Sequence, residues 1–463
     1  MVFSSLTFLQ CFLPLCLLAY FLVPKTWCNG TLFLFSLLFY AWGEPVYVVL
    51  MLFSIALDYT CGQMVERHRG KRGAKIALLV SVCVNLGLLG VFKYSDFLIG
   101  TVNSLFGTAL LQPNLPLPIG ISFYTFQTMS YTIDVYRGDA KAQKNIINFG
   151  AYVTLFPQLI AGPIVRYQTV ADELEHRDCS TDLFADGVKR FACGVGKKVL
   201  LANNIGLLWE AASAQAAPTV LTAWLGVIAY GFQIYFDFSG YSDMAIGLGR
   251  MLGFRFLENF NYPFLADSIT DFWRRWHISM GTWFRDYVYI PLGGNKGGLA
   301  KQLRNIAIVW LLTGFWHGAS WNFVLWGVYF GVLLVLEKLF LLRWLKKLPA
   351  ALRHIYALVL VTISWTLFAF TDIAEGFAWC RAMFSGVLFD RGSLYLLLTY
   401  GGMLLLCAIA ATPLRKTCYE KLNARLGQRA LTFADCGGLA CVLAASMAYL
   451  VSGSYNPFLY FRF

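Results

Sequence analysis

The run from Ile306 to Leu336 is the feature that most constrains the fold. It contains no Asp, Glu, Lys or Arg, and its one conventionally titratable base is His317. About 20 apolar residues suffice to cross a bilayer, so this longer run predicts a membrane-embedded segment that is tilted, bent or broken, with the break near Gly314 and Gly318. An ionisable side chain at membrane depth is costly and usually functional. The alternative is a histidine that only hydrogen-bonds a neighbouring helix.

The composition extends this interpretation to the whole chain. Charged residues make up 13% of the 463 residues, against about 25% in soluble domains, and the mean hydropathy is +0.60. The sequence therefore predicts an all-α, polytopic membrane protein. The net charge of +12 gathers in short clusters such as Glu66–Lys75, which indicates cytoplasmic loops rather than a nucleic-acid groove. Twelve Cys residues without a C-x-x-C pair indicate neither a disulfide framework nor a metal site.

The apolar runs predict one integral-membrane domain over residues 1–463, with N-terminal spans in 1–111, a core in 112–336 and C-terminal spans with an aromatic tail in 337–463. The first run lacks a cleavage pattern and is expected to be retained. The runs before and after Gly43–Pro45 are either one bent span or two. The expected spans are Leu6–Val23, Thr31–Trp42, Val46–Met64, Ile76–Phe92, Val220–Ile246, Ile306–Leu336, Ile355–Phe370, Leu394–Ala411 and Cys436–Val451.

Several segments do not look like ordinary spans. Ile119–Tyr136 mixes small polar residues with aromatic ones, which suits the lining of a buried polar cavity. Phe149–Ile164 contains two prolines and predicts a short or re-entrant helix. Phe184–Trp209 is amphipathic and is expected at an interface. The tail Asn456–Phe463 predicts either an interfacial anchor or a plug for a groove, on the extracytoplasmic side.

The polar end of Val220–Ile246 carries two carboxylates, Asp237 and Asp243, around a Ser-Gly-Tyr-Ser core that begins at Ser239. Carboxylates beside a membrane span need partners. The candidates are Arg250, Arg255 and Arg274.

Asp267–Tyr289 is the second unusual segment. Its aromatic residues recur at helical spacing and predict an apolar stripe, with Ser268 in an N-capping position. The opposite side offers Asp271, Arg274, Arg275 and His277. This segment is too charged to cross the bilayer as an ordinary span, so it either lies in the interface or is buried beside a polar cavity.

Six motifs, in order over residues 90–335, resemble the membrane-bound O-acyltransferase family, in particular its alginate-type branch of bacterial polysaccharide O-acetyltransferases. The matching stretches are Pro118–Gln127, Tyr131–Gly138, Phe156–Pro163, Tyr235–Gly249, Phe272–His277 and Gly314–Ala319. The resemblance implies a helical bundle around a tunnel. It also implies two polar signature positions: His317 matches the near-invariant family histidine, and His277 matches a position that is Asn, Asp or His in different branches.

The same resemblance implies an O-acetyltransferase of the bacterial inner membrane. The donor would be acetyl-CoA from the cytoplasm, with no permanently bound cofactor and no metal. The acceptor would be a hydroxyl of an extracytoplasmic polysaccharide (alginate, cellulose or peptidoglycan), or a relay serine on a separate periplasmic SGNH-hydrolase-like partner.

Acyl transfer needs an activated nucleophile and stabilisation of a tetrahedral oxyanion. A neutral imidazole can take the proton of an attacking hydroxyl, which contributes about 10²–10⁴-fold to the rate. We expect His317 to be this base, or else an acyl-carrying nucleophile, and His277 to orient a substrate and stabilise developing charge. Arg274 and Arg275 either meet a phosphate of the donor or pair with Asp271. Further candidate donor- and substrate-binding residues are Trp316, Trp321, Asn322, Asp237 and Ser239.

Three other functions fit parts of the pattern. A lipid or protein O-acyltransferase would use the same chemistry on longer acyl groups. A transporter or flippase would use the histidines and carboxylates as a proton or substrate path, although the sequence shows no internal repeat. A non-catalytic scaffold of a polysaccharide-export complex would not need His317.

Overall fold

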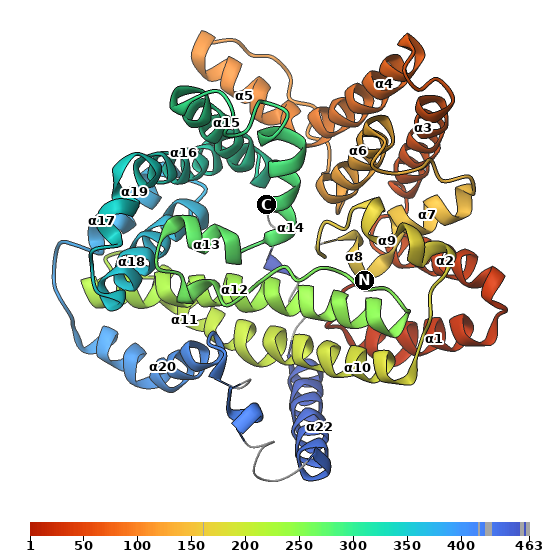
Figure 1. Ribbon diagram of the computed structural model, residues 1–463. Coiled ribbons are helices and arrows are strands. Elements are labelled where there is room, and N and C mark those ends of the chain that lie inside the picture. The colour runs from red at the N-terminus through yellow and green to blue at the C-terminus, as the bar shows by residue number, and fades with distance from the viewer. Residues whose placement is uncertain (161, 415–416, 422–427, 454–457, 460–463) are drawn as a thin grey trace. The chain divides into compact units, whose positions relative to one another are not determined.

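A computed structural model describes residues 1–160, 162–414, 417–421, 428–453 and 458–459. Every regular element in these residues is a helix, which confirms the all-α prediction (Figure 1). In this part of the chain, seven helical segments are long and apolar enough to cross a membrane: Val48–Arg67, Arg72–Phe106, Val220–Met251, Trp321–Leu345, Ala350–Ala369, Arg391–Ala410 and Thr432–Ser452. The chain is therefore a multi-pass membrane protein.

The chain folds into two compact units. Unit 1 comprises Met1–Phe191 and Tyr241–Leu257, and unit 2 comprises Ala192–Gly240 and Glu258–Phe463. The long helix α12 (Val220–Met251) contributes residues to both.

Unit 1 begins with two helices that are shorter than a full span, α1 (Leu13–Leu22) and α2 (Cys28–Ala41). A separate helix, α3 (Val48–Arg67), follows, so the two runs around Gly43–Pro45 form two helices. Helix α4 (Arg72–Leu89) continues through a π-turn into α5 (Ser95–Phe106), so the helical segment extends beyond the expected span Ile76–Phe92.

Helix α6 (Ile121–Arg137) packs against α3 and α4 (Figure 1). All residues from Ile121 to Thr132 are buried. Polar contacts join α3 and α4: Asp58 of α3 accepts hydrogen bonds from Ser81 and from Asn85 Nδ2 (2.8 Å), both on α4. The region around Pro157 is broken, as its sequence predicts, into α7 (Ile146–Thr154) and α8 (Phe156–Leu159), and α9 (Tyr167–Glu175) follows. In unit 1 the polar side chains therefore tie helices together inside the bundle.

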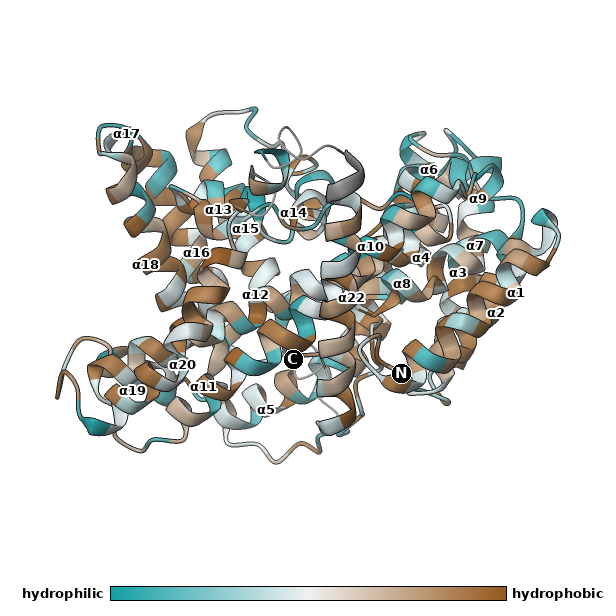
Figure 2. Cartoon of the chain, turned by 90° about the horizontal axis from the view of Figure 1, so that it is seen from below, coloured by the Kyte–Doolittle hydropathy of each residue, from teal (hydrophilic) through white to brown (hydrophobic). Residues whose placement is uncertain are grey.

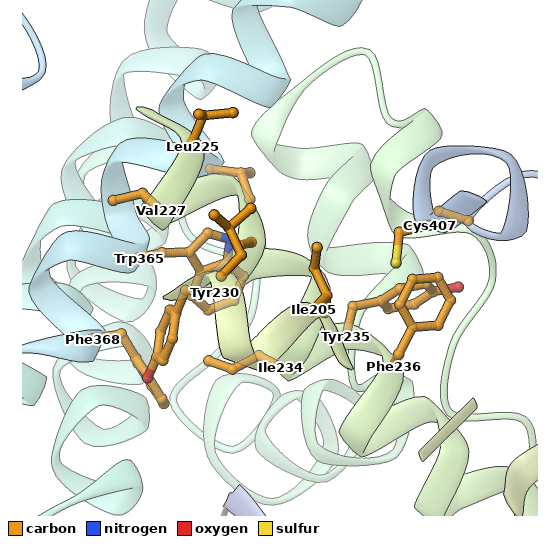
Figure 3. Close-up of a cluster of buried hydrophobic side chains, with 14 of the residues drawn as sticks. Ile205, Leu225, Val227, Tyr230, Ile234, Tyr235, Phe236, Trp365, Phe368 and Cys407 are labelled. Atoms are coloured by element: carbon orange, nitrogen blue, oxygen red, sulfur yellow. The ribbon is translucent and has the colours of Figure 1, made fainter. Parts of the chain in front are cut away.

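Unit 2 is built on an aromatic core. Side chains of α11 (Asn203–Ser213), α12 and α18 (Ala350–Ala369) gather in it, among them Tyr230, Trp365 and Phe368 (Figure 3). Unit 2 also contains α19 (Ile373–Ala382), α20 (Arg391–Ala410) and α22 (Gln428–Ser452). Apolar colouring runs along α16 (Trp321–Leu336) and α18, as expected for helices that meet lipid (Figure 2).

Helices α15 (Leu299–His317) and α16 form a tight antiparallel hairpin. Glycines allow the close approach: a Cβ on Gly314 would collide with the carbonyl oxygen of Phe323, and one on Gly327 would lie 2.5 Å from that of Trp310. Small residues at such crossings let membrane helices pack backbone to backbone. The predicted break in this apolar run is confirmed at Gly318, whereas Gly314 continues the helix.

Candidate active site

His277 sits at a break in the helical segment that the sequence suggested for Asp267–Tyr289. The predicted N-cap is confirmed, because the side chain of Ser268 accepts a hydrogen bond from Asp271 N at 3.1 Å. The helical spacing of the aromatic residues is interrupted: α13 (Ile269–Arg275) ends at an extended Trp276, and α14 (Ile278–Phe284) begins after His277.

The break has a specific backbone cause. His277 adopts left-handed φ and ψ of 47° and 53°. Backbone bonds from Ile278 N to Asn259 O (3.0 Å) and from Asn261 N to Arg275 O (2.9 Å) hold the chain on both sides of it. A left-handed conformation costs a non-glycine residue on the order of 1–3 kcal/mol, so these distant contacts outweigh the local helical preference.

The side chain of His277 is fully buried and hydrogen-bonded on one nitrogen. Its Nδ1 lies 3.1 Å from Asn259 Oδ1, which also accepts from Ser279 N (3.2 Å) and Ser279 Oγ (2.9 Å). Because an amide oxygen only accepts, Nδ1 carries the proton and Nε2 presents its lone pair. Within the described residues Nε2 has no hydrogen-bond partner. Burial lowers the pKa of His277 to about 3, so the imidazole is neutral at physiological pH.

His317 is the last residue of α15 and is held by aromatic rings. It is 5% exposed, and its ring meets Trp326 and Phe368 edge-on, at centroid distances of 4.9 and 5.5 Å. The extended residue Gly318 follows directly, and a side chain there would collide with the ring of Phe323. The imidazole is thus placed by packing and by the end of its helix.

Trp316 joins the two histidines. Its ring centroid lies 6.1 Å from that of His277 and 5.1 Å from that of His317, and the indole is 4% exposed. Phe238 packs edge-on against His277 at 4.7 Å. The structure therefore brings both predicted catalytic histidines to one buried indole.

The other predicted site residues are distributed unevenly. Asn322 is buried, and its Nδ2 donates to Leu367 O at 3.1 Å. Within the described residues its Oδ1 has no hydrogen-bond partner. The side chain of Trp321 is 50% exposed, so it is not a buried wall of this site.

Asp237 has a different partner from the expected arginines. It forms a buried ion pair with Lys198 and accepts a hydrogen bond from Leu459 N at 2.7 Å. Ser239, two residues further on, is also buried. A close approach explains the pair: a Cβ on Gly240 of α12 would lie 2.9 Å from Gly194 O of α10 (Thr181–Gly196), so the lysine just beyond α10 lies beside α12.

Asp243, in unit 1, is paired with Arg190 at 2.7 Å, a partner that the sequence reasoning missed. Of the predicted aromatic tail, only Phe458 and Leu459 are among the described residues. Phe458 is buried, with its ring 5.8 Å from Phe238, the residue that packs against His277.

The structure separates the two neighbouring arginines. Arg275 Nε pairs with Asp271 Oδ2 at 2.9 Å, one helical turn away. Arg274 is exposed and has no hydrogen-bond or ion-pair partner in the part of the chain that the structure describes. Of the two alternatives, pairing with Asp271 applies to Arg275, and Arg274 stays available for a ligand.

Comparison with known proteins decides the class. A sequence profile of the membrane-bound O-acyltransferase family matches residues 139–374, which include both histidines. A probable alginate O-acetylase of Azotobacter vinelandii is 39% identical to the chain over the full length of both. The chain belongs to the membrane-bound O-acyltransferase family.

Two further relatives show how widely these acyltransferases range. A peptidoglycan O-acetyltransferase of Helicobacter pylori is 29% identical over 100% of this chain and 98% of its own length. A teichoic acid D-alanyltransferase of Bacillus subtilis is 29% identical over 56% of this chain and 68% of its own. This membrane-bound acyltransferase is therefore similar to proteins named for different acceptors and for different acyl groups.

Two buried residues that contact candidate site residues gave almost no signal in the sequence. Asn259 lies in an irregular stretch 18 residues before His277, and neither period nor motif connects the two. Lys198 belongs to an amphipathic run in which a lysine is expected at the surface, yet it is 4% exposed. A basic residue on the apolar side of that run was the only available signal.

Proposed function

We propose that this acyltransferase moves an acetyl group from cytoplasmic acetyl-CoA to a hydroxyl of an extracytoplasmic polysaccharide, in the inner membrane of a bacterium. Transfer is either direct or through a separate periplasmic SGNH-hydrolase-like partner. The observation that carries the proposal is the pair of buried histidines, His277 and His317, on the indole of Trp316. The names of the relatives, an alginate O-acetylase and a peptidoglycan O-acetyltransferase, support the acetyl group and the glycan acceptor.

The two imidazoles have different roles in this proposal. His317 takes the proton from the attacking hydroxyl as its oxygen bonds to the thioester carbonyl carbon. When the tetrahedral intermediate collapses, the carbon–sulfur bond breaks and the same proton passes to the departing CoA sulfur. His277 presents a lone pair at Nε2, which accepts a hydrogen bond from a different hydroxyl or N–H group of the bound substrate and so orients that substrate.

Labelled acetyl transfer by the purified protein tests the proposal. The wild type and His317→Ala are compared with acetyl-CoA as donor, with and without periplasmic extract from the source cells. We expect His317→Ala to lose at least about 10²-fold in rate, because the base is gone. His176→Ala, which removes an exposed histidine, serves as the matched control and keeps full activity. Dependence on extract would identify the partner or the polymer as the missing component.

Equal rates for wild type and His317→Ala would overturn the catalytic assignment. A panel of donors with longer acyl groups tests the alternative of a lipid or protein O-acyltransferase. D-alanyl donors are included because one relative is named for D-alanyl transfer. If only longer acyl groups are transferred, the protein is a lipid or protein O-acyltransferase. Activity that requires an ion gradient would indicate a transporter or flippase.

A further inference from the structure

An apolar groove of about 360 Å³ lies between α18, α20 and the part of α12 that belongs to unit 2. Apart from Thr362, Thr412 and His354, its described lining residues are aliphatic, aromatic or glycine. Two of them are small and leave the groove open: Gly231 of α12 and the exposed Ala408 of α20. The groove is therefore an apolar hollow on helices that the chain places in the membrane.

The length of the groove matches one leaflet of a bilayer. His354 and Trp365, both on its wall, are eleven residues apart on α18, which corresponds to about 16 Å. The hydrocarbon core of a bilayer is about 30 Å thick, so one leaflet contributes about 15 Å. A helix with its side chains is about 10–12 Å across, too wide for a hollow of this volume and length. An extended acyl chain fits it.

One end of the groove is polar and lies beside basic residues. His354 is the first residue of α18 on the wall and the one ionisable side chain of the described lining. Its Nδ1 lies 3.0 Å from Ala266 O, which orients the ring. The exposed residues Lys346 and Lys347 come shortly before α18. The positive-inside rule assigns this end to the cytoplasm, where basic residues attract anionic lipid head groups.

Trp365 separates the groove from the candidate active site. Its ring belongs to the aromatic core of unit 2 and also forms part of the groove wall (Figure 3). The ring centroid lies 5.3 Å from that of Trp276, which directly precedes His277, and 5.9 Å from that of Phe368, which packs against His317. An empty space beside a ring forfeits dispersion contacts. Whatever fills the groove therefore affects how firmly the surroundings of both histidines are held.

We infer that the groove binds one acyl chain of an anionic phospholipid from the cytoplasmic leaflet, with the phosphate at the His354 end, and that the bound chain supports Trp365. The lipid acts in this role as a structural activator, and it neither donates nor accepts the acyl group. The effect on turnover rests on the proposed function, whereas the binding of the lipid does not.

Native mass spectrometry of the delipidated full chain in detergent tests binding without turnover. The probes are dioleoyl phosphatidylglycerol and dioleoyl phosphatidylcholine. We expect the wild type to bind phosphatidylglycerol severalfold more tightly, because its net charge is negative. Ala408→Phe, which places a ring in the groove, should weaken binding of both lipids about tenfold or more. His354→Gln should reduce only the preference for phosphatidylglycerol.

The matched control for the groove is Ile409→Phe. Ile409 is the next residue of α20, is 45% exposed and is not among the described lining residues. This variant should bind both lipids like the wild type. Equal binding by Ala408→Phe and the wild type would overturn the groove as the site. Equal affinity of the wild type for the two lipids would overturn the anionic head group.

Nanodiscs of phosphatidylcholine, with and without phosphatidylglycerol, test the support of Trp365. We expect phosphatidylglycerol to raise the unfolding midpoint of the wild type and to increase the rate of labelled acetyl transfer severalfold. Ala408→Phe should show neither response, because its ring takes the place of the chain, and Ile409→Phe should show both. Ala408 is exposed, so the larger ring does not enter the packed interior, and the midpoint in phosphatidylcholine alone checks that the variant is folded.

Two outcomes separate this inference from the proposed function. Lipid binding that changes neither the midpoint nor the rate would overturn the support of Trp365. Absence of acetyl transfer in every preparation would overturn the acetyltransferase alone, because the binding and the midpoint still report on the groove. A response to phosphatidylglycerol that Ala408→Phe retains would mean that the charge of the bilayer surface, and not this groove, causes the effect.

Discussion

The two buried histidines are held in opposite ways. The ring and backbone of His277 are fixed by polar contacts, from Asn259 and from the backbone on either side, around a left-handed residue. The ring of His317 is surrounded by aromatic groups at a helix end that uses ordinary helical and extended conformations. The position of the His277 side chain therefore depends on hydrogen-bond direction, and that of His317 depends on the shape of its aromatic surroundings. The difference predicts that the two will respond differently to the same kind of perturbation.

The largest effect is expected from the packing side of the comparison. Trp326→Ala removes a fully buried ring that touches both His317 and Trp273. Loss of such a ring should lower the free energy of unfolding by about 3–5 kcal/mol. The measurement is the unfolding midpoint in detergent. Trp321→Ala is the control, because that side chain is half exposed and should change stability by no more than about 0.5 kcal/mol. A small effect of Trp326→Ala would show that His317 is not held by packing.

Removal of the hydrogen-bonding partner tests the polar side. Asn259→Leu is close in size but leaves the Nδ1 proton of His277 and the Ser279 amide without their acceptor. Each orphaned buried group costs about 1–3 kcal/mol, and we expect acetyl transfer to fall with it because the imidazole loses its orientation. Steady-state rates and the unfolding midpoint report the two effects separately. Full activity in this variant would contradict the orienting role of Asn259.

The neutral state of His277 makes stability depend on pH. Its folded-state pKa of about 3 lies below its ordinary value of 6.5. Between these values the unfolded chain binds a proton that the folded chain excludes, so the free energy of unfolding rises with pH up to about 6.5 and is constant above it. The expected slope is about 1.4 kcal/mol per pH unit. Unfolding midpoints measured from pH 4 to pH 8 should depend less steeply on pH in His277→Gln than in the wild type. Identical slopes would show that another group causes the pH dependence.

The smallest effect concerns the backbone alone. Glycine adopts left-handed angles freely, so His277→Gly should be more stable than His277→Ala by about 1 kcal/mol. At His317, inside the last helical turn, the order should reverse, because glycine is less favourable than alanine in a helix by about the same amount. The measurement is the unfolding midpoint of the four variants with Gly or Ala at positions 277 and 317. If glycine and alanine rank in the same order of stability at both positions, the contrast between a strained and a relaxed histidine is contradicted.

The sequence predicted the parts of the fold that depend on composition and on local breaks. The charge-free run around His317 indicated both its burial and the break at Gly318, because polarity and glycine act locally. The interruption at His277 could not be predicted in this way. It is set by backbone bonds to Asn259 and Asn261, and no periodicity connects residues at that distance.

The contact partners of the candidate site residues could not be predicted from the sequence. The expected partner of Asp237 was an arginine, whereas the structure pairs it with Lys198, brought near by the glycine contact between α10 and α12. The sequence could not distinguish which of Arg274 and Arg275 pairs with Asp271. Only the direction of each side chain, set by the start of α13, distinguishes the paired arginine from the unpaired one.

The left-handed backbone at His277 limits which amino acids can evolve there. Outside glycine, this conformation is adopted most readily by Asn, Asp and His. The family resemblance implies the same three residues at this position in different branches. The turn thus acts as a conformational filter beside any selection for chemistry: a lineage changes its polar group here most readily within the small set that the backbone favours, and other replacements carry a backbone cost on the order of 1–3 kcal/mol in addition to any effect on acyl transfer.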